Sequence, residues 1–160
     1  MSTVDAPLPS APAVPGPAPR ILLVRAPYYR DVVDGMTAGA RRILADAGAT
    51  HDTLDVAGAF ELAQAIRLVL RGAGGFDGYV ALGCIVRGET DHYDHICRES
   101  IAGLMHVALQ YGIALGTGLL TVHDVAQAVA RSRQDGHNKG AEAAAAALTH
   151  VAVMRRMGAV

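Results

Sequence analysis

Short apolar runs recur along the chain and predict four strands. The runs cover residues 21–24, 53–56, 79–86 and 114–122. The first and third are apolar at nearly every position, which is typical of parallel strands covered on both faces. The fourth run is a weaker strand candidate, because Gly116 and Gly118 interrupt it.

Between these runs, apolar residues recur three and four positions apart, which is the spacing of one helical face. This spacing predicts helices over residues 32–47, 62–70 and 94–111, the first ended by Gly48. Asp124, with Gln127 three residues later, predicts a capped short helix, and the alanine-rich residues 139–157 predict a last one. The helix over 94–111 is expected to have one apolar face, formed by Ile101, Leu104, Met105 and Ala108.

Strands and helices therefore alternate from residue 21 onward. The alternation predicts an α/β fold, a three-layer α/β/α sandwich on a four-stranded parallel sheet with flavodoxin-like topology. No internal repeat interrupts residues 21–160, so they are expected to form one domain. Residues 1–20 are a proline- and alanine-rich tail, which favours an extended polyproline-like segment, either loose or laid along a neighbouring surface.

Charge, apolar run length and cysteine content argue against several classes of protein. The 160 residues have a formal net charge of −1, which gives no electrostatic footprint for nucleic acid or an anionic membrane. No apolar run reaches the roughly 18 residues of a membrane span, and the first twenty residues lack the pattern of a secretory signal. Cys84 and Cys97 show no CxxC spacing and indicate reduced thiols, so a cytoplasmic protein is expected.

Polar and aromatic residues gather where the predicted strands end, which is where open α/β sheets bind ligands. Tyr28 and Phe60 are two of only seven aromatic residues, and both lie at such ends. They favour a stacking platform for a flat heterocycle, although rings that plug the sheet ends are an equally good interpretation. Glu61 is suited either to accept hydrogen bonds from a polyol or to sit at the start of its helix.

A candidate anion site follows the third strand. Gly88, Glu89 and Thr90 precede a helix, where free backbone N–H groups bind phosphate. Arg131 and Arg133 are candidate bidentate partners for the same anion, with solvated helix-end charges as the commoner alternative. Lys139 begins the last helix, where the helix dipole disfavours a cation.

His92 is the best candidate for proton transfer in this segment. His92, Asp94, His95 and Cys97 raise the alternative of a metal site, but the usual zinc-ligand spacings are absent. An imidazole with a pKa near neutrality serves general acid–base chemistry. We therefore expect no metal.

Four stretches carry a resemblance to a known family. They are residues 26–29 (APYY), 56–61 (VAGAFE), 83–94 (GCIVRGETDHYD) and 138–140 (NKG). Over about residues 20–157 the chain resembles the lumazine synthase family of riboflavin biosynthesis. The third stretch is the most specific, since the pattern RGxTxHxD after an apolar strand is rare outside that family.

The resemblance implies a cofactor-independent transferase. It implies condensation of 5-amino-6-ribitylamino-pyrimidinedione with 3,4-dihydroxy-2-butanone 4-phosphate to 6,7-dimethyl-8-ribityllumazine, phosphate and water, the penultimate step of the pathway. Carried over residue by residue, Tyr28 stacks on the pyrimidine, and Lys139 lies near the heterocycle. The remaining roles are the ribityl chain for Ala59, Phe60 and Glu61, the phosphate for Gly88, Glu89, Thr90 and Arg131, and proton transfer for His92.

The resemblance also implies a homo-oligomer with sites between adjacent subunits and a functional link to riboflavin synthase. A Phe that reaches the neighbouring site in many relatives is Thr117 here, and the usual Arg-Phe before the first helix is Pro27-Tyr28. Residues 133–138 (RQDGHN) lack the loop pattern of the sixty-subunit shells. We therefore expect a pentamer or a pair of pentamers.

Two other classes compete with this interpretation. A protein that holds riboflavin or a lumazine without making it would fit the changed positions Pro27 and Thr117, but it needs neither His92 nor a phosphate loop. A flavodoxin-like signalling receiver would need clustered acidic residues after the first strand, where residues 25–27 (RAP) offer none.

Overall fold

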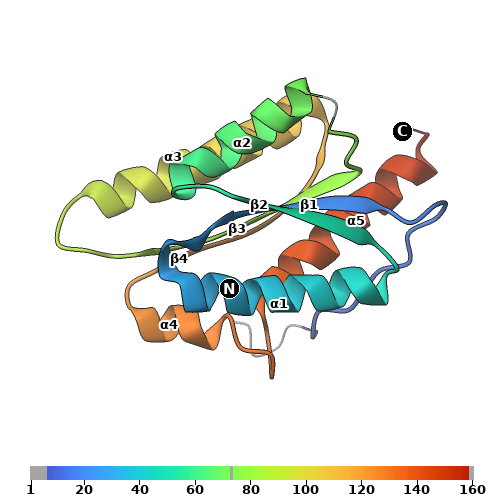
Figure 1. Cartoon of the computed structure of the whole chain (residues 1–160). Coiled ribbons are helices and arrows are strands. Elements are labelled where there is room, and N and C mark those ends of the chain that lie inside the picture. Colours follow the sequence, from blue (N-terminus) through green and yellow to red (C-terminus); the bar gives the residue numbers. More distant parts are fainter. Residues whose placement is uncertain (1–6, 73, 159–160) are drawn as a thin grey trace.

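The computed structural model describes residues 7–72 and 74–158, which form a four-stranded parallel sheet between two helical layers (Figure 1). The strand order is β2-β1-β3-β4, with β1 at Arg20–Ala26, β2 at Thr50–Asp55, β3 at Gly78–Val86 and β4 at Ala114–Val122. All three strand pairs are parallel. The predicted α/β fold with flavodoxin-like topology is confirmed.

Helices cover both faces of the sheet (Figure 1). The helices α2 (Ala59–Arg71) and α3 (His92–Tyr111) pack together on one face. The other face carries α1 (Arg30–Asp46), α4 (Val125–Ala130) and α5 (Lys139–Arg156), while a 3-10 turn, η1 (Pro27–Tyr29), joins β1 to α1. Among these helices of the described residues, none is long and apolar enough to cross a bilayer.

Burial explains why the inner strands were readily predicted and the outer ones less so. Every residue of β3 except Val86 is buried, as continuous apolar runs predict. β2 forms one sheet edge and is exposed over most of its length. β4 forms the other edge, and Gly116 lets α5 lie close, because a Cβ there would overlap the backbone carbonyl of Ala143. The glycine that weakened the prediction is thus required by helix packing.

The helix α3 departs from its predicted apolar face. Leu104 is buried, but Ile101 is 42% and Met105 is 46% exposed. The buried side is instead Ser100, Leu104 and Val107. Helical spacing shows which residues share a face, but it does not show how much of that face one chain covers. Part of the apolar face of α3 is therefore open in the single chain.

The described part of the tail lies against the domain. Ala11 and Val14 pack on the core cluster that α1 and α5 share with the sheet. The Nη1 of Arg155 donates to the carbonyl oxygens of Pro15 at 2.9 Å and Pro17 at 2.6 Å. The tail from Ala11 to Pro17 thus lies along the surface of the domain, and residues 1–6 are outside the described part.

Candidate functional site

A cavity of about 270 Å³ opens at the carboxyl ends of β1 and β3, beside the start of α2. Five of the predicted site residues line it: Tyr28, Ala59, Gly88, Thr90 and His92. The remaining lining residues are Tyr29, Gly58, Cys84, Ile85, Val86, Tyr93 and Ile96. The chain therefore gathers residues from three separate strand ends around one space, as the sheet rule predicts.

The two predicted stacking residues, Tyr28 in the cavity lining and Phe60 beside His92, are open rather than packed into the sheet. Tyr28 is 79% and Phe60 is 39% exposed. The Phe60 ring lies 6.1 Å from the imidazole of His92, edge to face, and Tyr28 meets Tyr29 edge to face at 5.2 Å. Exposed rings do not plug the sheet ends, so these two are available to stack on a ligand.

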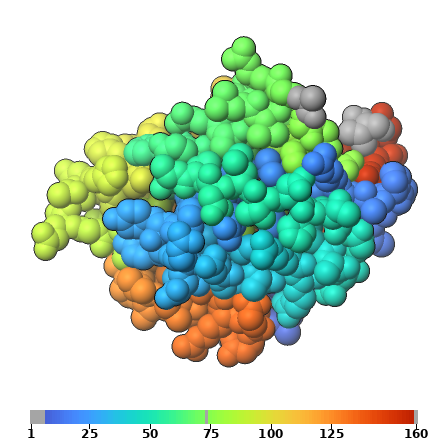
Figure 2. All heavy atoms as spheres, viewed as in Figure 1, coloured from blue at the N-terminus to red at the C-terminus, as the bar shows by residue number. Residues whose placement is uncertain are grey.

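The loop between β3 and α3 presents unused backbone donors. Among the hydrogen bonds of the described residues, none uses the N–H of Gly88, Glu89 or Thr90. A Cβ built on Gly88 would meet no atom within 4 Å, so the space beside this glycine is open. In Figure 2 the yellow-green segment that contains the loop protrudes from the left edge of the molecule. Free N–H groups just ahead of a twenty-residue helix are suited to bind an anion.

His92 is the first residue of α3 and has an exposed side chain. Its neighbour Asp94 pairs instead with Arg87, whose Nη2 lies 2.6 Å from Oδ1, and Arg87 also covers the Tyr93 ring at 4.6 Å. The His95 Nδ1 lies 3.2 Å from Arg98 Nη2. Within residues 7–72 and 74–158, no group of three His, Cys, Asp or Glu side chains is arranged to hold a metal ion.

Phe60, Glu61 and Glu89 lie outside the lining of this cavity. Glu61 is in the first turn of α2, with its carboxylate folded toward Gly58, whose Cβ position lies 3.2 Å from Oε2. No side-chain hydrogen bond caps α2. The Glu61 carboxylate therefore sits beside the cavity entrance at Gly58, and the Glu89 side chain is exposed.

The other three predicted residues line different space. Thr117, Arg131 and Lys139 surround a cavity of about 240 Å³ along the free edge of β4. The backbone N–H of Lys139 donates to the Arg131 carbonyl at 2.9 Å, which joins the two residues through the main chain, and the Nη1 of Arg131 donates to the Gln127 carbonyl at 2.9 Å. Lys139 Nζ also pairs with Glu142 at 2.6 Å. The single chain thus divides the predicted site into the His92 cavity and what we call the β4 edge site: Thr117, Arg131 and Lys139.

Two residues near the candidate site were missed from the sequence. Asn138 is fully buried and is the N-cap of α5: its Oδ1 accepts from the N–H of Gly140 and Ala141. Its Nδ2 donates to the carbonyls of Gly35, Ser132 and Arg133. The preference of Asn for N-cap positions ahead of an alanine-rich helix was a usable signal.

Cys84 is the second missed residue, since it lines the His92 cavity from inside β3. Burial raises the pKa of the Cys84 thiol to about 11. Burial also raises the pKa of Tyr29 beside it, with a smaller contribution from the Cys84 charge. At neutral pH the thiol is therefore protonated and forms part of the apolar wall rather than a nucleophile.

Comparison with known proteins gives one consistent result. The family model described as 6,7-dimethyl-8-ribityllumazine synthase matches residues 18–155. The chain is 44% identical to the 6,7-dimethyl-8-ribityllumazine synthase of Paramagnetospirillum magneticum, covering 87% of this chain and 97% of the relative. It is 47% identical to 6,7-dimethyl-8-ribityllumazine synthase 1 of Rhizobium meliloti, covering 87% and 94%, and 42% identical to the Agrobacterium fabrum protein, covering 88% and 97%.

Proposed function

The chain belongs to the 6,7-dimethyl-8-ribityllumazine synthase family, and from this premise we propose that it is the transferase that forms the lumazine of riboflavin biosynthesis. Its substrates are 5-amino-6-(D-ribitylamino)pyrimidine-2,4-dione and 3,4-dihydroxy-2-butanone 4-phosphate. The products are 6,7-dimethyl-8-ribityllumazine, phosphate and water, which makes this the penultimate step, ahead of riboflavin synthase. The observation that carries the proposal is the His92 cavity, where exposed rings, free backbone amides and an imidazole meet.

The pyrimidine substrate has its binding groups on one side of the cavity. Tyr28 stacks on the flat ring, and the start of α2 (Ala59, Phe60 and Glu61) binds the ribityl chain. Backbone groups at Gly58 and Ala59 line the cavity directly. The Glu61 carboxylate accepts hydrogen bonds from ribityl hydroxyl groups.

The phosphate substrate binds on the opposite side, at the loop of residues 88–90. The unused N–H groups of Gly88, Glu89 and Thr90 donate to the phosphate oxygens, and the dipole of α3 favours the anion. His92 at the start of the same helix is then close to the bond-forming atoms. The loop binds and orients, and the imidazole moves protons.

The chemistry requires several proton transfers at neutral pH. The amine attacks the ketone, a first water leaves to form an imine, and phosphate is eliminated. The ribitylamino nitrogen then attacks the remaining carbonyl to close the ring, and a second water leaves. An imidazole accelerates such steps by roughly 10²–10⁴-fold. Holding both substrates in one orientation contributes through effective concentration. No metal or organic cofactor is needed in this scheme.

The assembly completes the site. We place the β4 edge site of one subunit against the His92 cavity of its neighbour, so that Arg131 pairs with the bound phosphate, and Lys139 and Thr117 approach the heterocycle. The support is that these residues line separate cavities in the single chain and that apolar Ile101 and Met105 lie exposed on α3. A cytoplasmic pentamer, or a pair of pentamers, is the proposed form.

One assay tests the proposed function. Purified protein is mixed with both substrates, and lumazine fluorescence and phosphate release are followed together. Equal amounts of both products are expected. A protein that binds the pyrimidine tightly but releases no phosphate would instead be a binding module without the synthase activity.

A further inference from the structure

The edge strand β2 has little apolar surface to hold it in place. Its sequence is THDTLD, and only Leu54 is even half-buried. It pairs with β1 along one side, and none of the strands in residues 7–72 and 74–158 pairs with its other side. Its position therefore depends on the β1 ladder and on polar side-chain contacts, more than is the case for buried β3.

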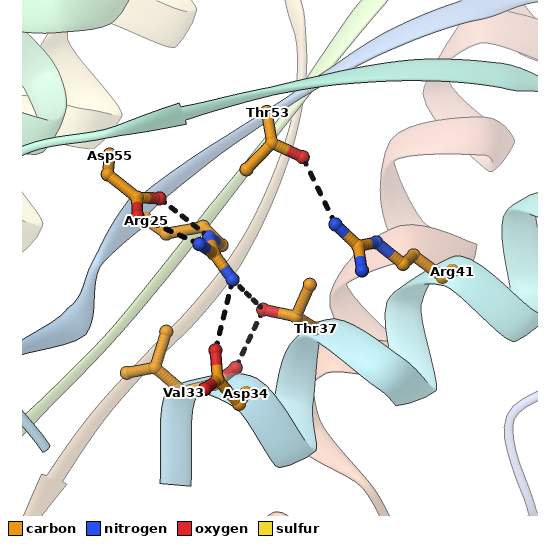
Figure 3. A network of polar contacts seen from close by, with 7 residues as sticks. All are labelled: Arg25, Val33, Asp34, Thr37, Arg41, Thr53 and Asp55. Atoms are coloured by element: carbon orange, nitrogen blue, oxygen red, sulfur yellow. Dashed lines mark hydrogen bonds and ion pairs between the residues drawn. The ribbon is translucent and has the colours of Figure 1, made fainter. Parts of the chain in front are cut away.

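Arg25 makes the strongest of these polar contacts (Figure 3). It stands in register with Asp55 on the neighbouring strand, so both side chains point to the same face. Its Nε lies 2.7 Å from Asp55 Oδ1 and its Nη2 lies 2.8 Å from Oδ2, which is a bidentate pair. Its Nη1 reaches Asp34 Oδ1 of α1 at 3.1 Å.

The environment of Arg25 makes these contacts stronger than surface ion pairs. The arginine side chain is only 13% exposed, against 44% for Asp55 and 51% for Asp34. The hydrogen bond to Asp55 is the main cause that raises the pKa of Arg25 above its ordinary value. Thr37 completes the network: its Oγ1 lies 3.4 Å from Arg25 Nη1 and donates to the Val33 carbonyl. Figure 3 shows one guanidinium joining β1, β2 and α1.

The two elements tied by Arg25 lead directly to one side of the His92 cavity. The Val56 N–H donates to the Arg25 carbonyl at 2.8 Å, and Gly58 and Ala59 line the cavity a few residues later. On the other side of the network, α1 follows directly after Tyr28 and Tyr29. The loop of residues 88–90 instead follows β3, and among the described residues no hydrogen bond or ion pair joins the Arg25 side chain to that strand.

We infer that Arg25 is a positioning residue for the pyrimidine substrate alone. It fixes residues 56–61 relative to Tyr28 through Asp55 and Asp34, without touching either substrate. The inference deepens the proposed function and rests on its assignment of the pyrimidine to Tyr28 and the start of α2. Its consequence is selective: loss of the network weakens pyrimidine binding and spares the phosphate loop.

The test is calorimetric titration of the full-length protein in its native assembly. The probes are 5-amino-6-(D-ribitylamino)pyrimidine-2,4-dione and, separately, inorganic phosphate. Arg25→Met, which keeps the length of the side chain and removes its donors, is expected to weaken pyrimidine binding about tenfold and to leave phosphate binding unchanged. Arg25→Lys keeps the positive charge but loses the bidentate guanidinium geometry, so its pyrimidine binding is expected to weaken only about threefold.

Steady-state kinetics supply the second readout. In Arg25→Met the KM for the pyrimidine should rise about tenfold while kcat stays within about twofold, because uniform binding is lost rather than transition-state stabilisation. Arg41→Met is the matched control: Arg41 is an exposed arginine of α1 that reaches the same strand at Thr53 Oγ1, 3.5 Å away. Its pyrimidine binding should equal that of the wild type.

Two results overturn the inference. One is an unchanged pyrimidine Kd in Arg25→Met, and the other is an equal loss of pyrimidine and phosphate binding, which would indicate a general disturbance of the fold. Turnover by the wild type is a separate arm. A wild type that forms no lumazine contradicts the proposed function, and the binding titrations still decide the role of Arg25.

Discussion

The two halves of the candidate site differ in almost every property. The His92 cavity has exposed rings, unused backbone amides and one imidazole, and no Lys or Arg lines it. The β4 edge site contains Arg131 and Lys139, whose main chains are joined by a backbone hydrogen bond, on a strand edge that α5 approaches closely. The His92 cavity has an imidazole that can move protons, and the β4 edge site has the cations that can bind a phosphorylated substrate. The difference supports the proposal that the two halves come together from adjacent subunits.

The largest effect is expected at the proton-transfer residue of the first half. His92→Ala should lower kcat by about 10²–10⁴-fold, because the imidazole carries the protons in several steps. Pyrimidine binding should be nearly unchanged, since the stacking and polyol contacts come from Tyr28 and the start of α2. Pre-steady-state and steady-state rates check this, and an unaltered kcat would remove His92 from the mechanism.

Arg131→Ala tests the second half and should show a different kinetic signature. Loss of a charge-assisted pair with phosphate is expected to raise the KM for the phosphate substrate by about 10–100-fold. The backbone hydrogen bond from Lys139 to residue 131 does not involve the side chain, so the geometry of the edge should persist. The matched control is Arg133→Ala, a nearby exposed arginine that does not line the β4 edge cavity. Equal KM values in the two variants would remove Arg131 from the phosphate site.

A pair of glycine variants compares a glycine beside the proposed phosphate site with a glycine packed against α5. Gly88→Ala places a methyl group where no protein atom lies within 4 Å, so stability should be unchanged while the KM for the phosphate substrate rises about tenfold. Gly116→Ala drives a methyl group into the backbone of α5 and should lower the free energy of unfolding by about 3 kcal/mol. Thermal unfolding and phosphate-substrate kinetics on both variants check this. A destabilised Gly88→Ala with normal kinetics would contradict it.

The smallest expected effect is on the pH dependence of the free energy of unfolding, and it arises from Cys84 in the wall of the His92 cavity. The Cys84 thiol has an ordinary pKa of 9.0, which burial raises to about 11. Between these values the unfolded chain has lost the proton and the folded chain has kept it, so the free energy of unfolding falls as pH rises, by about 2 kcal/mol. From pH 8 to pH 11 the free energy of unfolding of the wild type should fall by about 2 kcal/mol more than that of Cys84→Ala, as measured by denaturant titration. Other groups whose pKa burial raises, such as Tyr29, contribute equally to both proteins. Parallel curves would exclude a buried thiol at this wall.

The residues of the His92 cavity were predicted well from the sequence. The separation of the candidate site into two cavities was not predicted. Residues that follow buried strands directly, such as Tyr28 and His92, were found because parallel strands end at a common edge. The separate position of Arg131 and Lys139 was not foreseen, since sequence spacing carries no information about which cavity a side chain lines. The half-open apolar face of α3 escaped prediction for the same reason.

Polar side chains that join distant segments were the hardest to predict. Arg25 and Asp55 are thirty residues apart and meet only because β1 and β2 align in register. Asn138 reaches Gly35 across 103 positions of the chain. Hydrophobic periodicity does not report such pairs, whereas the N-cap preference of Asn would have pointed to Asn138.

Mixing two impaired variants tests the shared site most directly. His92→Ala and Arg131→Ala proteins are unfolded together in equal amounts, refolded and assayed at substrate concentrations well below the wild-type KM. If each site takes His92 from one subunit and Arg131 from the next around a ring, about a quarter of the sites receive both residues, and about a quarter of wild-type activity returns. If one chain supplied both residues, the mixture would be no more active than the two variants assayed apart, and the account of two half-sites would be wrong.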